Sequence, residues 1–204
     1  MFIQVQQATP DDAALSAILA SAGPVPGAVY PTPTASVPLT PTGPVPPELL
    51  TVPDIPLRSV ADDAGRLSIS VPSSWTETDV GPQLNDDASD RPRVAAAPIL
   101  DDFYSDWEAP GVQVVAFPFT DDASTLLTNL GFADRCDDGG VQSFSNGTLT
   151  GLMQTWTACG DTASRNVQLA VSPADQSMTV FVEIQLPDED DSPLQAVLSS
   201  LRVA

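Results

Sequence analysis

Cys136 and Cys159 are the only thiols of this 204-residue chain, and their spacing favours a pair. They enclose Asn146-Gly147, a dipeptide that tolerates the positive φ angles of a two-residue type I′ turn, so the flanking runs should pair antiparallel. Such a turn leaves the thiols one diagonal step out of register, and a bulge near Gly139-Gly140 would close the gap. The alternative is two buried free cysteines. We predict a Cys136–Cys159 disulfide, which implies an oxidising, extracytoplasmic compartment.

Pairs of aspartates recur along the chain and raise the question of calcium binding. Calcium loops alternate their ligands around a glycine turn, and none of these pairs has that pattern. Those at 101, 121 and 190 stand where helices are expected to begin, and carboxylates stabilise the positive end of a helix dipole. We therefore predict no metal site and no cofactor, with at most weak binding of divalent cations. The pairs are Asp62-Asp63, Asp86-Asp87, Asp101-Asp102, Asp121-Asp122, Asp137-Asp138 and those within Asp188 to Asp191.

Few side chains are suited to catalysis. The sequence contains no histidine and no lysine, which excludes histidine-based triads and Ser-Lys dyads. Two cysteines cannot form a four-thiolate zinc site. Gly160-Asp161-Thr162-Ala163 faintly resembles the turn of aspartic proteases, but that motif requires glycine after threonine and a second aspartate. Asn146-Gly147-Thr148 is a glycosylation sequon that the turn already explains. We predict no catalytic residues, and hence not an enzyme.

The charge of the chain narrows the range of partners. It has 27 acidic residues against seven basic ones, all arginine, and a formal net charge of −20 at pH 7. Residues 59–204 alone carry 23 acidic residues against six arginines. Such a surface repels nucleic acid and anionic bilayers, and no apolar run reaches the 18 residues of a membrane span. We expect a protein partner, or an upstream domain of the same polypeptide.

Proline divides the chain into parts. Eleven of the 21 prolines fall between Pro24 and Pro56, in a stretch with threonine and almost no charge, which favours an extended linker. We predict a short strand and helix over 1–22 as the remnant of an upstream domain, a disordered Pro/Thr-rich linker over 23–58, and one folded domain over 59–204. The start lacks the basic and apolar regions of a signal peptide, so the exported chain is expected to be a piece of a larger protein.

Hydrophobic patterns within 59–204 predict an α+β domain that would position these residues. The segment 111–119 is apolar on both faces, which indicates a sheet covered on each side. Trp75 is expected to anchor the core, and Phe103 and Trp107 should share one helix face. Leu194, Val197, Leu198 and Leu201 form one helical stripe. Strands are expected at 66–71, 93–98, 111–119, 167–172 and 178–186, and helices at 101–107, 121–130 and 193–203.

The order of these motifs resembles the PsbP-like fold. The resemblance covers roughly residues 60–203 and is closest to the extracytoplasmic PsbP-like domains of actinobacteria, relatives of the LpqN-type lipoproteins. It implies an antiparallel sheet with helices on both faces, an αβα sandwich, and a role in binding or assembly. Similar modules stand alone behind lipid anchors or follow trypsin-like protease domains, but this chain has neither a lipobox cysteine nor protease residues. The motifs are DDAGRLSISVPSSW, LDDFYSDW before a buried strand, the cysteine hairpin with Thr150-Gly151, and the terminal helix after two long strands.

The sequence therefore predicts a non-catalytic, extracytoplasmic binding or accessory module within a larger secreted or surface protein. Two alternatives stay open. The domain could instead be the regulatory C-terminal domain of a trypsin-like serine protease, or a stand-alone carrier of an apolar ligand.

Overall fold

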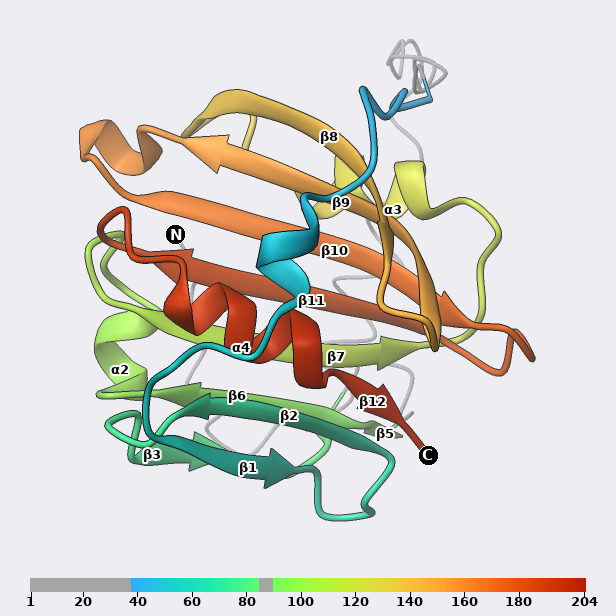
Figure 1. Ribbon diagram of the computed structural model, residues 1–204, viewed down its shortest axis with the longest axis horizontal. Coiled ribbons are helices and arrows are strands. Elements are labelled where there is room, and N and C mark those ends of the chain that lie inside the picture. Colours follow the sequence, from blue (N-terminus) through green and yellow to red (C-terminus); the bar gives the residue numbers. More distant parts are fainter. Residues whose placement is uncertain (1–37, 85–89) are drawn as a thin grey trace, which may run out of the picture. The chain divides into compact units, whose positions relative to one another are not determined.

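The computed structural model describes residues 38–84 and 90–204, where the chain forms an α+β domain (Figure 1). Its main sheet is antiparallel, with strand order β3-β6-β7-β11-β10-β9-β8. The segments expected over 1–22 and 23–37, and the Asp86-Asp87 pair, lie outside the described residues. The strands are β3 (Glu77–Asp79), β6 (Arg93–Ala97), β7 (Gly111–Phe117), β8 (Asp137–Ser145), β9 (Leu149–Thr157), β10 (Arg165–Pro173) and β11 (Thr179–Leu186).

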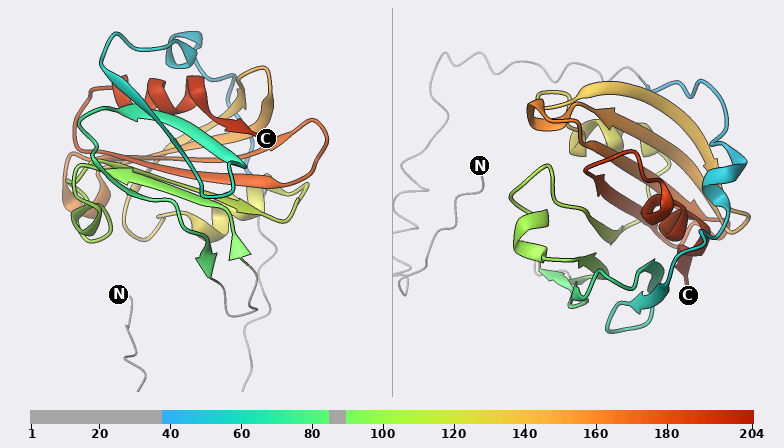
Figure 2. Two further views of the ribbon diagram at one scale, coloured as in Figure 1. Left: turned by 90° about the horizontal axis from the view of Figure 1, so that it is seen from below. Right: turned by 60° about the vertical axis from the view of Figure 1, so that its left-hand side comes forward.

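Helices lie on both faces of this seven-stranded sheet, as Figure 2 shows. One face carries α4 (Ser192–Ser200), the 3-10 helix η1 (Pro47–Leu50) and a second, three-stranded sheet; α3 (Ala123–Leu130) lies on the other. The predicted αβα sandwich with an antiparallel sheet is thereby confirmed. The smaller elements are α2 (Leu100–Phe103), η2 (Cys159–Asp161), the three-stranded sheet of β1 (Leu57–Ala61), β2 (Leu67–Pro72) and β12 (Arg202–Val203), and the short pair β4 (Gln83–Leu84) and β5 (Asp90–Arg91).

The main core lies between the seven-stranded sheet, α4 and the three-stranded sheet. The α4 side chains predicted to form one stripe are all buried, and alternate residues of β2 meet them. Trp75 is only 3% exposed, which confirms it as a core anchor. Burial of each large aliphatic side chain stabilises the fold by roughly 1.5–3 kcal/mol relative to leaving it in water.

β7 is buried on both faces, which confirms the prediction that its sheet is covered on each side. Val112 and Val114 face the main core. Phe181, which lies opposite Val115 on the neighbouring β11, belongs to a second cluster under Leu127 of α3. The near-continuous apolar run of β7 therefore reflects two packed layers rather than one.

A proline-rich segment, residues 42–50, first lies along the outer edge of β8 and then forms η1, which packs against α4; we call it the strap (Figure 1). The backbone N–H groups of Thr42 and Val45 donate to Val141 and Ser143 of β8 at 2.9 Å, and Ser143 donates back to Gly43 at 2.8 Å. Prolines surround these positions but occupy none of them, so every required donor is present. The strap falls within the linker predicted over 23–58, and its non-proline backbone groups complete part of a sheet edge.

The strap also contributes to the core, and this can be tested at Val45. Val45 is 4% exposed and belongs to the main core, so Val45→Ala should lower the free energy of unfolding by about 2 kcal/mol through lost burial and a cavity. Urea unfolding measures the change. Val52→Ala is the matched control, because Val52 is 72% exposed, and its effect should stay near zero. Equal effects of the two variants would contradict the packing of the strap.

The hairpin β8–β9 has a longer turn than predicted. β8 ends at Ser145, which lies opposite Thr150, and β9 begins at Leu149, so residues 146–148 form the connection instead of a two-residue turn. Gly147 has φ 88°, and the side-chain oxygen of Asn146 accepts hydrogen bonds from the backbone of Thr148 and Leu149. That side-chain turn replaces the expected backbone turn. The predicted bulge near Gly139-Gly140 is present, as a register shift between Asp138 and Val141.

Asn146 also connects the hairpin to α4. Its side-chain nitrogen donates to the carbonyls of Leu198 and Leu201, at 3.4 and 3.3 Å, at the C-terminal end of the helix. Asn146→Ala should therefore lower the unfolding free energy by roughly 1–2 kcal/mol, as it leaves helix carbonyls and turn N–H groups without partners. Thermal denaturation measures this, with the exposed Asn129→Ala of α3 as control. A midpoint equal to that of the control would rule out the connection.

Two helices differ from their predicted bounds. α3 begins at Ala123, two residues after the predicted start at 121, and Asp122 caps it by accepting from the Thr125 N–H at 2.8 Å. Gly131, which follows α3, has φ −76°, and a Cβ there would lie 2.8 Å from the ring of Trp156. α2 ends at Phe103, so Trp107 lies beyond the helix.

Candidate functional site

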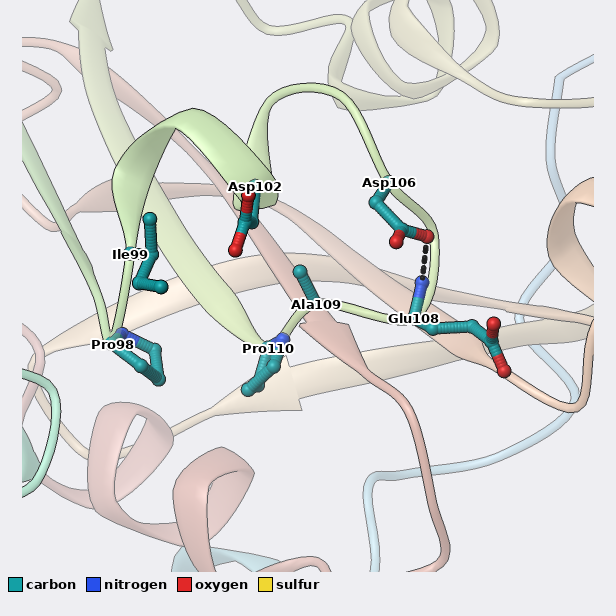
Figure 3. Close-up of a pocket in the computed structure, with 7 residues that line it drawn as sticks. All are labelled: Pro98, Ile99, Asp102, Asp106, Glu108, Ala109 and Pro110. Atoms are coloured by element: carbon teal, nitrogen blue, oxygen red, sulfur yellow. Dashed lines mark hydrogen bonds between the residues drawn. The ribbon is translucent and has the colours of Figure 1, made fainter.

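A pocket of about 270 Å³ lies where the chain leaves β6 and returns to β7 (Figure 3). We call it the 98–110 pocket. Four of its residues are apolar and three are acidic, and none of them is basic. Its lining consists of Pro98, Ile99, Asp102, Asp106, Glu108, Ala109 and Pro110.

The backbone around the pocket is fixed from several sides. The side-chain nitrogen of Gln185 on β11 donates to the carbonyls of Asp106 and Ala109, each at 2.6 Å. The Leu100 N–H donates to Glu77 of β3 at 2.8 Å. Phe103 of α2 is 6% exposed and packs where Gly111 begins β7, so closely that a Cβ on Gly111 would overlap the ring. The loop is therefore preformed by contacts to three different strands.

The side chains of the pocket remain free for a partner. Ile99 is 50% exposed, although it is a large apolar residue. Asp106 accepts a hydrogen bond from the Glu108 N–H at 2.9 Å, as Figure 3 shows. Within the described residues, the carboxylates of Asp102 and Glu108 have no hydrogen bond or ion pair. The pocket thus offers an apolar surface bordered by negative charge that nothing in the described chain neutralises.

A row of polar side chains crosses the same sheet on the face that α3 covers. Gln113, Glu183, Gln168 and Gln154 occupy neighbouring positions on β7, β11, β10 and β9. We call this the polar row. Gln168 is fully buried and Gln154 is 3% exposed. Burying a side-chain amide without hydrogen bonds raises the free energy of the folded state. The partners of both glutamines therefore matter for stability.

Gln168 is hydrogen-bonded through both polar atoms of its side chain and joins three elements. Its side-chain oxygen accepts from the indole N–H of Trp156 at 2.9 Å. Its nitrogen donates to the Leu130 carbonyl at 2.8 Å, at the end of α3. This residue therefore holds α3 and β9 in place around β10.

Glu183 is the titrating member of the row. Its carboxylate accepts from the side-chain nitrogen of the buried Asn166 at 3.2 Å. Burial raises the pKa of Glu183 to about 7, and the Asn166 hydrogen bond opposes that shift. The buried side-chain oxygens of Asn166 and Gln154 accept no hydrogen bond from the described residues.

Tyr104 directly follows α2 and is 51% exposed. Burial raises the pKa of its phenol; the charge of Arg93 opposes this, while Asp79 and Glu183 add to it. The strand register places the side chains of Arg93, Asp79 and Glu183 on the same face of the sheet. Arg93 is already paired with Asp79, so Glu183 is the unpaired charge near the phenol.

The structure joins the predicted pair Cys136 and Cys159 by a disulfide, with Cα atoms 4.2 Å apart. Cys159 is fully buried, and the chain passes it through left-handed conformations at Ala158 and Asp161. Gly160 also has a positive φ and lies against the Trp107 ring, which meets Phe132 edge-on at 5.0 Å. The disulfide therefore fixes a tight, strained corner at the base of the hairpin.

The stretch Gly160-Asp161-Thr162 lies in this corner and not in the 98–110 pocket. The hydroxyl of Thr162 donates to the Cys159 carbonyl at 2.7 Å, which closes the turn. The same corner lines a second hollow of about 500 Å³, together with Arg135 and Asp137. The weak resemblance to an aspartic-protease turn thus corresponds to a structural turn beside the disulfide.

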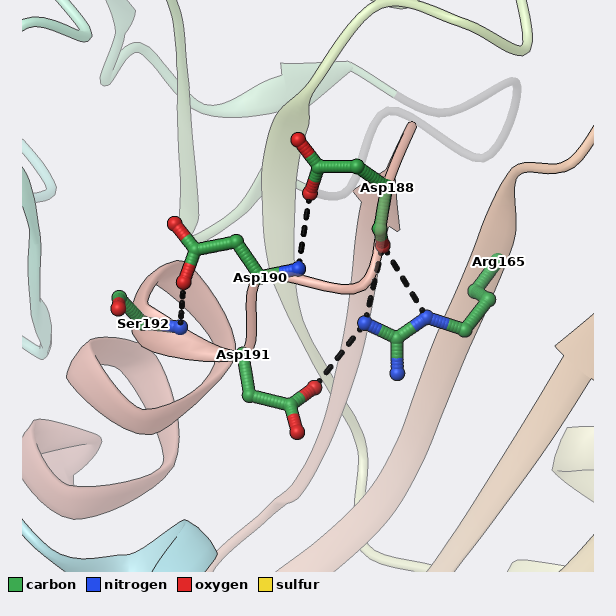
Figure 4. Close-up of polar contacts among 5 residues, drawn as sticks. All are labelled: Arg165, Asp188, Asp190, Asp191 and Ser192. Atoms are coloured by element: carbon green, nitrogen blue, oxygen red, sulfur yellow. Dashed lines mark hydrogen bonds and ion pairs between the residues drawn. The ribbon is translucent and has the colours of Figure 1, made fainter.

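The aspartates from 188 to 191 have local structural roles, as Figure 4 shows. Asp188 accepts from the Asp190 N–H at 3.0 Å, and Asp190 from the Ser192 N–H at 2.9 Å at the start of α4. The Ser192 hydrogen bonds lower the pKa of Asp190. Asp191 pairs with Arg165 at 3.0 Å. The interpretation of this run as a helix start is confirmed.

The described residues contain no group of three or more potential metal-ligating side chains placed to hold an ion. Within the same ranges, no helix combines the length and apolar character that a membrane span requires. These findings concern the described residues alone.

No protein-family profile matches the chain, and no curated protein matches it. Its structure is similar to the solution structure of cyanobacterial PsbP (CyanoP) from Synechocystis sp. PCC 6803, at 14% identity and a TM-score of 0.38, over 75% of this chain and 95% of that one. The TM-score is too low to place this chain in the PsbP family, which stays a resemblance.

Sequence reasoning missed both the 98–110 pocket and the polar row. Asp101-Asp102 were interpreted only as a helix start, and the pocket forms because the helix ends early, at Phe103. The polar row had a visible signal. Gln113, Gln168 and Glu183 each occupy the middle of an otherwise apolar strand, where a polar side chain must meet another.

Proposed function

We propose that this chain is a non-catalytic, extracytoplasmic binding or accessory module of a larger secreted or surface protein. The 98–110 pocket carries the binding part of this proposal. An apolar patch with convergent polar groups, on a backbone fixed from three strands, is the usual form of a recognition site. The disulfide supports the compartment, since such bonds persist mainly in oxidising environments.

The alternatives differ in their support. A stand-alone carrier of an apolar ligand requires space between the sheet and α4, and that layer is filled by buried aliphatic side chains. A regulatory domain behind a trypsin-like protease remains a variant of the proposal, and reading the genomic DNA upstream of Met1 tests it directly. A protease reading frame there would make the larger protein an enzyme with this chain as its accessory domain.

Site-specific photo-crosslinking tests the binding function. A photoreactive amino acid at position 99, introduced in producing cells, should form a discrete protein adduct that an excess of unlabelled chain suppresses. The same amino acid at the exposed position 52 is the control and should not form it. Absence of any competable adduct from positions 99, 104 and 108 would contradict binding through this surface.

Fractionation of the same cells tests the compartment. Protein from the envelope or medium should resist thiol alkylation until it is reduced. A chain found only in the cytosol with both thiols free would contradict the extracytoplasmic assignment, whatever the outcome of crosslinking.

A further inference from the structure

We infer that the 98–110 pocket accepts a lysine or arginine side chain from an extended segment of a basic partner protein. This inference rests on the proposed binding function and specifies the chemistry of its partner. The aliphatic stem of such a side chain would cover the apolar residues, and its cationic head would reach the carboxylates.

The apolar part of the lining fits the stem. The side chains of Pro98, Ile99 and Pro110 line the pocket and have no hydrogen-bond donors, and long basic side chains bury their methylene groups against such apolar groups. The volume of about 270 Å³ falls just below the roughly 300–1,000 Å³ of typical small-molecule sites. The pocket therefore suits one long side chain better than a larger ligand.

The acidic part of the lining fits the head group. Several carboxylates at helix starts are engaged: Asp122 and Asp190 accept backbone N–H groups, and Asp191 pairs with Arg165. By contrast, Asp102 and Glu108 have no such partner among the described residues. The ion pairs of the described residues are three, and none includes a pocket residue.

Other occupants fit the charge less well. A second copy of this chain carries the same net charge of −20, so two copies repel each other. Residues 1–37 of the chain itself contain two aspartates and no basic residue. The pocket carboxylates are not among any metal-ligating group of the described residues. A basic protein segment satisfies both the apolar and the acidic part of the lining.

The test is an NMR titration of the isotope-labelled full chain with a capped peptide, Ala-Arg-Ala-Arg-Ala. Shifts should concentrate on the Ile99 methyl groups and on the amides of residues 98–110, and binding should weaken with salt. The matched peptide carries citrulline in place of arginine, with nearly the same shape and no charge. It should bind roughly tenfold more weakly or worse, because charge-assisted hydrogen bonds are lost.

Matched variants separate the pocket from the general charge of the surface. Asp102→Asn, Asp106→Asn and Glu108→Gln together should weaken arginine-peptide binding by roughly tenfold or more. The control replaces three exposed carboxylates elsewhere, Asp63→Asn, Asp134→Asn and Asp175→Asn, with the same change in net charge. It should leave binding within about twofold. A third variant, Ile99→Ser, removes only apolar surface and should also weaken binding.

Three outcomes would overturn the inference: equal binding of the citrulline peptide, equal loss in both triple variants, or shifts outside residues 98–110. Melting curves of the variants verify that they are folded. If a crosslinked partner forms at position 99 while the arginine peptide does not bind, the inference fails and the binding function stands. If neither occurs, the binding function fails as well.

Discussion

Removing the Cys136–Cys159 disulfide is expected to lower the thermal midpoint by roughly 10 °C. The bond links residues 23 apart, and on the chain-entropy model a loop of this size stabilises the fold by about 3 kcal/mol. For a domain of this length each kcal/mol corresponds to about 2–4 °C. The positive φ angles of Ala158 and Asp161 work against this effect, because backbone strain that relaxes once the bond is gone offsets part of the lost stabilisation.

Calorimetry of the wild type with and without reductant measures this, together with two double variants. Replacement of both cysteines by serine places a hydroxyl at the fully buried position 159, whereas alanine does not. Serine should therefore be the more destabilising of the two. Two free thiols in protein isolated from the envelope would remove the physical basis for the extracytoplasmic assignment. A thermal midpoint that reductant leaves unchanged would do the same.

Glu183→Gln is expected to stabilise the protein at pH 8 relative to the wild type, and much less at pH 4.5. The pKa of Glu183 is about 7 in the folded chain against an ordinary 4.5, so between these values the folded state holds a proton that the unfolded chain releases. The stability that this group contributes is complete below pH 4.5 and is lost as the pH rises through 7. The full difference is about 3 kcal/mol.

Urea unfolding of both proteins at pH 4.5, 6 and 8 measures the effect as a difference between the two curves, which cancels all other titrating groups. The control is Glu189→Gln, at an exposed position beyond the same strand. Its free energy of unfolding should change with pH in parallel with that of the wild type. Parallel curves for Glu183→Gln as well would show that the carboxylate is hydrated and not buried in the polar row.

Local patterns predicted the main elements well. The stripe of α4 and the alternation in β10 and β11 depend on periodicity alone, and all of these elements formed where they were expected. Trp75 was predicted as a core anchor just after the strand that precedes it, and its N–H donates to the Pro72 carbonyl at 3.0 Å in the turn that follows β2. Such features are encoded within a few neighbouring residues, so no tertiary information is needed to find them.

Features that depend on distant partners were not predictable in this way. The strap has the composition of a linker, and only the exposed edge of β8 gives its backbone a partner. The length of the hairpin turn depends on Asn146, whose side chain is shared between the turn and α4. The 98–110 pocket depends on Gln185, about 80 residues away in the chain, which fixes the loop backbone.

The strap has a consequence for how the domain behaves among its own copies. A sheet edge with unpaired N–H and C=O groups is a template on which another chain can add a strand, and aggregation often begins there. The strap covers the middle of that template, at Val141 and Ser143 of β8, and the opposite edge strand, β3, is only three residues long and carries Glu77 and Asp79. Proteolysis that released the strap would therefore expose backbone N–H and C=O groups of β8 to pairing with another strand.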